Sequence, residues 1–279
     1  MFRYIIKPAV SMRREPSVFS EVVSEALFSE EIAVLDSIDG WLKIATSVDH
    51  YEGWIADGSV CERSTPFLSD GKEIVVDRCA AHLYREPDTI YGPILTLPFE
   101  SRLQLCRELD DGRWIEVAFP NGLRGFIQRG DVAFDWRPID LQSLIILSHK
   151  FLGLPYTWGG RSSFGYDCSG YVQMLFRRMG IYLPRDAEDQ YVWEGLSGLV
   201  PLNQLEPGDL LFFGFSEDKI KHVGFHLKEG SFIHTAASTE NAPYVRVSHV
   251  RDKAWSGAGF YPYVSAKRVN DLDHLCFCE

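Results

Sequence analysis

The chain has no apolar run long enough to span a bilayer and no excess of basic residues. Its 279 residues include 39 acidic and 28 basic side chains, which give a formal net charge of -11 at pH 7. That balance disfavours nucleic acid and an anionic membrane as main partners. Residues 1–8 lack the apolar segment and the small-residue cleavage site of a secretory signal. The simplest expectation is a cytoplasmic protein, and a clipped signal is the less favoured alternative.

Cysteine is also scarce: six in a chain of this length do not make a disulfide framework. Cys61, Cys79 and Cys106 lie among apparent strands, so we expect them to be packing residues. Residues 276–278 read Cys-Phe-Cys, a spacing shorter than the usual zinc pair. We expect a frayed tail at 269–279, with metal capture as a minor alternative, and no cofactor or metal elsewhere.

The first half of the chain repeats itself. Arg-Glu-Pro at residues 14–16 returns at 85–87, and an Asp-Gly turn with a short apolar run at 39–44 returns at 111–117. Self-similarity at a nearly fixed interval indicates a duplicated unit. Because each copy has short alternating runs cut by turns, the repeat predicts two small all-β barrels.

Two stretches are typical of domain boundaries. Residues 64–71 are mostly polar and contain Pro and Gly, and residues 135–138 end in a proline. The domains predicted from them are barrels at 1–64 and 72–134 and a larger third domain at 139–268. In that third domain helices come first and strands follow, which is the order of an α+β fold.

Local patterns within the third domain predict several elements. A capped helix is expected over 140–152, with His149 on its surface. Strands are expected at 210–213, 245–247 and 259–261. The residues expected to face the core from the helix are Leu141, Leu144, Ile145, Ser148 and Leu152.

A Gly-rich, aromatic loop delivers Cys168 to the start of a second helix. Apolar residues recur at helical spacing over 172–179, and Gly180 is a plausible stop. Asp167 is a good N-cap residue, with a carboxylate that can accept from free backbone N–H groups. The positive end of the helix dipole favours the thiolate, the form that attacks. The alternative is a small buried apolar residue.

Three histidines lie in two short strands around a turn that we centre on Lys228. This register places His222 opposite His234, with Cβ atoms about 5 Å apart. His222 could then act as a base for Cys168 while His234 orients it. A one-residue slip would break the arrangement. His226 lies on the same face and is the competing base.

Five motifs together resemble the NlpC/P60 family of cell-wall peptidases. They are YTWGG at 156–160, DCSG at 167–170, LPRDA at 183–187, PGDL at 207–210 and HVG at 222–224. Their order and spacing match the family, and the likeness covers about the last half of the chain.

The resemblance implies a papain-like cysteine peptidase in which Cys168 is the nucleophile, His222 the base and His234 the polar third member. Tyr156 would support the oxyanion together with the Cys168 backbone N–H, and such donors are often the largest catalytic contribution. Trp158, in the same loop, is a candidate substrate-binding residue. The two barrels would be bacterial SH3-like domains.

The resemblance also implies a substrate: peptidoglycan stem peptides, cut between γ-D-glutamate and a diamino acid, diaminopimelate, after a free N-terminal L-alanine. In such relatives a tyrosine of the first SH3-like domain and the Asp and Ser beside the nucleophile hold the free amine. The matching residues are Tyr51, Asp167 and Ser169. Tyr51 could equally be a surface aromatic and Asp167 a plain helix cap.

Two positions in the LPRDA motif stay open. Arg185 either pairs with a substrate carboxylate or forms a structural salt bridge. Ala187 stands where some relatives place a hydroxyl residue, and this departure leaves part of the amine site open. 

Three other interpretations remain: a non-catalytic wall-binding protein, an amidase or acyltransferase on the same fold, and a Cys/His metal site. Retention of all three catalytic residue types favours the peptidase, which we expect to be a monomer.

Overall fold

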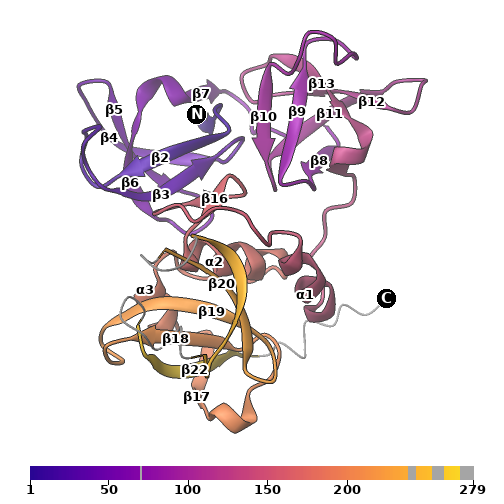
Figure 1. Ribbon diagram of the computed structural model, residues 1–279. Helices are drawn as coiled ribbons and strands as arrows, with labels where there is room; N and C mark the ends of the chain where they lie inside the picture. The colour runs from indigo at the N-terminus through magenta and orange to yellow at the C-terminus, as the bar shows by residue number, and fades with distance from the viewer. Residues whose placement is uncertain (70, 238–242, 253–260, 271–279) are drawn as a thin grey trace. The chain divides into compact units, whose positions relative to one another are not determined.

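The computed structural model describes residues 1–69, 71–237, 243–252 and 261–270. It comprises two compact units, treated separately below (Figure 1). Unit 1 is Met1–Trp136 with Ser162–Phe164, and unit 2 is Arg137–Arg161 with Gly165–Glu279. Within the described ranges, no helix has the length and apolar character needed to cross a membrane. The Cys-Phe-Cys segment and most of the tail expected at 269–279 lie outside the described residues.

The first sheet of unit 1 is antiparallel, in the order β3-β2-β6-β5-β4, and a separate pair joins β1 to β7. A short 3-10 helix, η1, precedes β7. The bounds are β1 (Phe2–Ile5), β2 (Ala9–Arg13), β3 (Val22–Leu27), β4 (Ile32–Ile38), β5 (Trp41–Thr46), β6 (Glu52–Ala56), η1 (Asp57–Ser59) and β7 (Val60–Arg63).

The second sheet of unit 1 has the order β10-β9-β13-β12-β11-β8-β14, with η2 before its last strand. It repeats every neighbouring pair of the first sheet and also the β1-β7 pair, and a β11-β8 ladder joins these two parts into one sheet. The sequence repeat thus reappears as a repeated strand order. The bounds are β8 (Glu73–Val76), β9 (Ala80–Tyr84), β10 (Leu95–Pro98), β11 (Arg102–Glu108), β12 (Trp114–Ala118), β13 (Arg124–Gln128), η2 (Arg129–Asp131) and β14 (Val132–Ala133).

Each sheet of unit 1 has its own apolar core. Alternating side chains such as Met12, Ile44 and Ile55 fill the first, and Ile74, Leu103, Ile115 and Ile127 contribute to the second. Cys61, Cys79 and Cys106 are half-buried.

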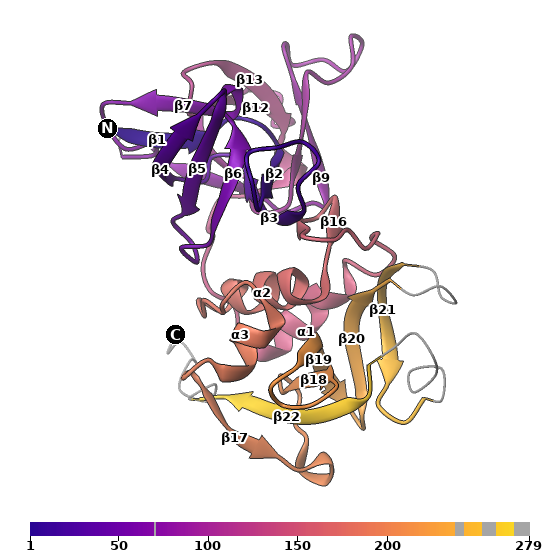
Figure 2. The same ribbon diagram turned by 90° about the vertical axis from the view of Figure 1, so that its left-hand side faces the viewer.

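Unit 2 is built on a six-stranded antiparallel sheet in the order β17-β22-β18-β19-β20-β21, with helices α1, α2 and α3 on one side of it (Figure 2). A two-stranded β15-β16 pair precedes the second helix. The bounds are α1 (Leu141–His149), β15 (Arg161–Ser162), β16 (Gly165–Tyr166), α2 (Cys168–Arg178), α3 (Ala187–Val192), β17 (Leu196–Val200), η3 (Leu202–Gln204), β18 (Leu210–Gly214), β19 (Ile220–Lys228), β20 (Ser231–Ala236), β21 (Tyr244–His249) and β22 (Tyr263–Val269).

The first helix of unit 2 is capped as predicted but ends earlier. Asp140 accepts a 2.7 Å hydrogen bond from the Ser143 backbone N–H, and the helix closes at His149, which is exposed. Because the helix stops short of it, Leu152 is 45% exposed, and Leu147 takes the buried position instead. Two of the five predicted core-facing residues, Leu144 and Ser148, are buried.

The strand predicted at 210–213 is β18, the central strand of this sheet, flanked by β22 and β19. All five of its residues are buried, which explains why its sequence is a continuous apolar run instead of an alternating one. The strand predicted at 245–247 lies within β21. The one predicted at 259–261 is wrong in its described part: Tyr261 lies outside any strand, β22 begins at Tyr263, and residues 259–260 are outside the described residues.

Candidate active site

Cys168 is the first residue of α2, as its sequence predicts. The Asp167 carboxylate caps the helix by accepting from the Gly170 backbone N–H at 2.7 Å. The loop carbonyl of Gly160 lies so close to this turn that a Cβ on Gly170 would come within 2.3 Å of it. The glycines of the YTWGG and DCSG motifs therefore let the loop backbone press directly on the turn that carries the thiol.

The sulfur of Cys168 lies against the strand that carries the first histidine. Backbone hydrogen bonds from Val223 and Ser169 favour the charged form of the thiol, which places both amides at the sulfur. Val223 follows His222 directly on β19, and α2 packs on that strand. The start of α2 and strand β19 thus bring together Cys168 and Val223, which are more than fifty positions apart in the chain.

His222 and His234 meet, but in a register different from the predicted one. The structure pairs Phe225 with Ile233 and His226 with Phe232, a shift of two residues. A shift by an even number keeps every side chain on its face. His222 and His234 are therefore diagonal neighbours with ring centroids 5.0 Å apart, not directly opposed residues.

A missing side chain makes room for this diagonal contact. The observed register continues to place Gly224 opposite His234. A Cβ on Gly224 would lie 2.5 Å from the Phe232 ring and 3.4 Å from His234 Cβ. Glycine at this position lets both aromatic side chains lie over the strand.

The two rings form a buried hydrogen-bonded pair. His222 Nε2 lies 3.1 Å from His234 Nδ1, and His234 Nε2 lies 2.9 Å from Ser248 Oγ on β21. The two histidines are 5% and 0% exposed. With Nε2 of His222 taken up by His234, Nδ1 is the atom of that ring suited to exchange a proton with a neighbouring thiol.

Burial sets the protonation of these groups in the ligand-free site. Burial raises the pKa of the Cys168 thiol to about 12, and the negative charge of Asp167 adds to the rise. Burial lowers the pKa of His222 to about 3, with the Arg246 cation as a second cause. Burial, then His222 and Arg246, hold the pKa of His234 well below its usual range.

These pKa shifts oppose the expectation of a resting thiolate. The helix N-terminus does favour negative charge on Cys168, but the loss of solvation outweighs it. At neutral pH the favoured resting form is a neutral thiol beside neutral imidazoles. Ionisation of the thiol then has to be coupled to proton transfer onto His222.

Tyr156 lies beside the thiol. Burial raises the pKa of its phenol, and the charges of Cys168 and Asp167 contribute to the same rise. A backbone hydrogen bond of 2.8 Å from Tyr156 to Pro243 fixes this part of the loop. The hydroxyl therefore remains protonated at neutral pH and keeps its capacity to donate.

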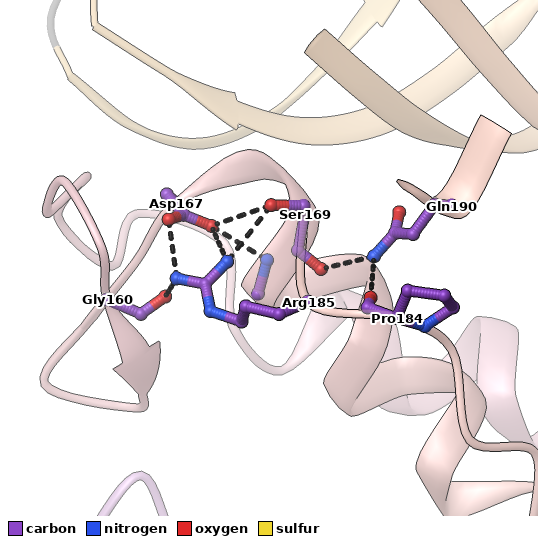
Figure 3. Close-up of polar contacts among 7 residues, drawn as sticks. Gly160, Asp167, Ser169, Pro184, Arg185 and Gln190 are labelled. Atoms are coloured by element: carbon purple, nitrogen blue, oxygen red, sulfur yellow. Dashed lines mark hydrogen bonds and ion pairs between the residues drawn. The ribbon is translucent and has the colours of Figure 1, made fainter. Parts of the chain in front are cut away.

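Arg185 lies in a buried salt bridge with Asp167 (Figure 3). Its guanidinium donates hydrogen bonds to both carboxylate oxygens, at 3.0 and 2.6 Å, and to Ser169 Oγ at 3.0 Å. The Arg185 side chain is 1% exposed. Of the two roles considered for this residue, the geometry displays the structural one, and Asp167 serves as helix cap and as counter-ion at once.

Gln190, on α3, is a residue of this site that the sequence interpretation missed. Its amide donates to the backbone carbonyls of Ser169 and Pro184, at 3.1 and 2.9 Å, and so ties α3 to the first turn of α2 (Figure 3). Ala187, the first residue of α3, is buried. Nothing in the local sequence distinguishes Gln190 from a surface glutamine, because the short helix that buries it was not predicted.

The other candidates fall in different surroundings. Trp158 is 61% exposed in the loop before α2. His226 donates a hydrogen bond from Nδ1 to the Glu206 carbonyl at 2.7 Å and accepts one from the Gly230 N–H at Nε2. It is therefore a structural residue of the hairpin. Tyr51 belongs to unit 1, where it packs against the core of the first sheet.

Within the described residues, no group of three or more His, Cys, Asp or Glu side chains is placed to hold a metal ion. The chemistry that the site can perform is that of its thiol, its imidazoles and its hydrogen-bond donors. The components of nucleophilic acyl transfer are a thiol, a proton acceptor and an orienting partner, and the thiol here is half-buried.

Comparisons with known proteins agree with this assignment. The NlpC/P60 family matches residues 153–260, and the family described as bacterial dipeptidyl-peptidase SH3 domain matches residues 12–60. A γ-D-glutamyl-L-lysine dipeptidyl-peptidase of Bacillus subtilis is 30% identical over 223 residues, which span 77% of this chain and 72% of the relative. One from Bacillus cereus is 29% identical over 233 residues, which span 77% and 68%.

A crystal structure of an NlpC/P60 family protein from Bacillus cereus shares the fold. It has a TM-score of 0.82, at 22% identity, over 96% of this chain and 99% of that one.

Proposed function

We propose, from the premise that the chain belongs to the NlpC/P60 family of cysteine peptidases, that it hydrolyses the γ-D-glutamyl-diamino acid amide bond of peptidoglycan stem peptides. Support for the bond comes from the relatives named γ-D-glutamyl-L-lysine dipeptidyl-peptidase, which align over most of this chain. The observation that carries the catalytic part is the order of groups in unit 2. The Cys168 sulfur lies at the Val223 amide, and His222 Nε2 bonds to His234.

In the proposed reaction, Cys168 Sγ attacks the γ-carbonyl carbon of D-glutamate while its proton passes to His222. The carbon–nitrogen bond then breaks, and His222 donates that proton to the leaving amine. Water adds to the resulting thioester, the carbon–sulfur bond breaks, and the proton returns to the thiol. His234 orients His222 and accepts a hydrogen bond from its imidazolium form.

Charge develops on the carbonyl oxygen during both attacks. The Tyr156 hydroxyl and the Cys168 backbone N–H are the donors we assign to it. Tyr156 is half-buried beside the thiol, and its raised pKa keeps the proton on the phenol. A donor held in place before the reaction stabilises the transition state without a reorganisation cost.

We assign the free N-terminal amine of the substrate to Asp167 and Ser169, which lie side by side in unit 2. A carboxylate and a hydroxyl suit an ammonium group, whose unpaired burial would be costly. Arg185 fixes the Asp167 carboxylate from its buried side, so only the exposed edge of that group, 12% of the side chain, is available to a ligand. Trp158, largely exposed in the adjoining loop, offers an apolar surface to the peptide.

We also assign the second sheet of unit 1 as a second SH3-like barrel. Its strand order repeats that of the first sheet, which carries the matched SH3 domain. The domains proposed are therefore barrels at 1–64 and 72–134 and a papain-like peptidase domain at 139–268.

The test is mass spectrometry of products from L-Ala-γ-D-Glu-diaminopimelate, the same peptide with L-lysine third, and the N-acetylated peptide. We expect release of L-Ala-γ-D-Glu from the free-amine peptides and much slower cleavage after acetylation. Cys168→Ala is the control and should release no dipeptide. Equal rates with and without the acetyl group would remove the amine site from the proposal, and absence of cleavage in every peptide would refute the proposed substrate.

A further inference from the structure

The hydrogen-bond chain of the site extends past the second histidine. His234 Nε2 lies 2.9 Å from Ser248 Oγ, and Ser248 pairs with Phe232 across the β20-β21 ladder. Residues two apart along a strand share a face, so Ser248 and His234 point to the same side of the sheet. The chain thus runs from β19 through β20 to the edge strand β21.

If His222 acts as the base, its role determines which ring nitrogen carries the proton in both His222 and His234. To take the thiol proton on Nδ1, neutral His222 has to carry its own proton on Nε2. That N–H donates to His234 Nδ1, which therefore has to be unprotonated. Neutral His234 then carries its proton on Nε2, and the atom placed to accept that proton is Ser248 Oγ.

The opposite tautomers would disable the site. If His234 carried its proton on Nδ1, it would donate to His222 Nε2, and His222 would be protonated on Nδ1. That nitrogen could then take no proton from the thiol. A hydrogen-bond acceptor at His234 Nε2 therefore supports the productive arrangement, because without one the buried N–H of that tautomer would lose its partner.

We propose that Ser248 is a positioning residue that holds His234 in the tautomer and ring orientation able to accept a hydrogen bond from His222. The inference rests on the proposed function for its catalytic reading and extends it by one residue. Ser248 acts through His234 and need not touch the substrate.

The contribution of Ser248 should be largest after the thiol proton has moved to His222 and made that ring positively charged. As His222 gains the thiol proton, its Nε2–H becomes a stronger donor, and His234 is polarised toward Ser248. Arg246 on β21 pairs with His234 in the ladder, and its positive charge helps to keep His234 neutral. Removal of the serine hydroxyl should therefore affect the chemical step more than substrate binding.

The experiment uses three variants of the full chain. Ser248→Ala removes the hydroxyl and Ser248→Thr retains it. The matched control is Thr235→Val, which removes a buried hydroxyl one residue from His234 that has no hydrogen-bond partner among the described residues. For each variant we would measure kcat and KM on the stem peptide, the alkylation rate of Cys168 by iodoacetamide at pH 7, and the thermal midpoint.

We expect Ser248→Ala to lower kcat roughly ten- to a hundredfold, the effect of a hydrogen bond to a group that becomes charged, with KM almost unchanged. Alkylation should slow as well, because it also needs His222 to take the proton. Ser248→Thr should recover both rates, and Thr235→Val should match the parent protein.

Parent-like rates in Ser248→Ala would overturn the proposal. A loss confined to KM, an equal loss in Thr235→Val, or a loss that follows a lowered thermal midpoint would also overturn it. If the parent protein cleaved no stem peptide, the proposed substrate would fail by itself. The alkylation series would still decide the role of Ser248, because it uses no substrate.

Discussion

His234 reaches His222 diagonally across two strands: its Nδ1 lies 3.1 Å from Nε2 of His222, although the two residues are not paired in the ladder. The contact exists because the residue between them on the sheet face, Gly224, has no side chain. Orientation of the proposed base thus depends on backbone register and on a glycine as much as on the histidines themselves.

The first prediction concerns that glycine. Gly224→Ala would drive a methyl group to 2.5 Å from the Phe232 ring, which has to move and displace His234. We expect a loss of about 1–3 kcal/mol in unfolding free energy, as for other overpacked cores, and a drop in kcat. Chemical denaturation and steady-state kinetics measure both. Gly198→Ala is the control, since a Cβ there meets nothing within 4 Å; equal effects of the two changes would contradict this explanation.

The second prediction concerns the buried pair of Arg185 and Asp167. Arg185→Met leaves the carboxylate buried without its counter-ion and should cost about 3–5 kcal/mol of stability. Adding Asp167→Asn should recover part of that loss, because asparagine keeps the helix cap without the charge. Breaking an exposed pair by Arg14→Met should cost at most about 1 kcal/mol.

Urea denaturation of the parent protein and of these three variants measures each difference in unfolding free energy. If Arg185→Met left stability unchanged and only raised KM, Arg185 would be a substrate-binding residue, as one of the interpretations of the sequence holds.

The third prediction tests the oxyanion donor. Tyr156→Phe removes one hydroxyl and should lower kcat by about 10²–10³, the usual effect of losing one such donor, with little change in KM. Tyr182→Phe is the control, because Tyr182 is 57% exposed in the same unit. An unchanged kcat in Tyr156→Phe would assign the oxyanion to other groups.

The fourth prediction concerns pH. Burial raises the pKa of Cys168 to about 12 and lowers that of His222 to about 3, so the pair holds one proton throughout the window from pH 5 to pH 9. A thiolate–imidazolium pair has the same proton count as the neutral pair. Alkylation of Cys168 through it should therefore be level across this window.

His222→Ala is the matched variant. Without the base, the thiol has to lose its proton to solvent, and because its pKa is raised, alkylation should rise about tenfold per pH unit up to pH 9. Iodoacetamide kinetics on both proteins, followed by peptide mass spectrometry, give the two profiles. A parent profile that rises as steeply as the variant profile would show that the thiol and His222 are not coupled.

Sequence reasoning found the local features of the site because local rules set them. Asp167 as a cap, Cys168 at a helix start and His222 on a strand follow from spacing and residue type. The register around Lys228 could not be read in the same way. Lys228 pairs with Ser231 instead of forming the centre of the turn, and after the irregularity between His226 and Lys228 the ladder stands two residues from the predicted register. Because the shift is by an even number of residues, His222 and His234 still share a face of the sheet. They therefore meet as predicted, although as diagonal neighbours and not as the directly opposed residues of the predicted register.

Long-range features explain the other differences. Ser248 joins the site through strand pairing, and Gln190 through a helix of only six residues, and neither leaves a periodic pattern. The protonation of Cys168 depends on how deeply the helix tip is buried, which no local sequence shows. The duplication in unit 1, by contrast, could be predicted because its motifs recur in the sequence at a nearly fixed interval.

The most direct test of the account is to trap the acyl-enzyme intermediate, the thioester on Cys168. The protein would be mixed with L-Ala-γ-D-Glu-diaminopimelate, quenched in acid within milliseconds, and digested for mass spectrometry. The account predicts an L-Ala-γ-D-Glu adduct on the peptide that contains Cys168, and no turnover by folded Cys168→Ala. Cleavage that persists in Cys168→Ala, or an adduct on another residue, would contradict it.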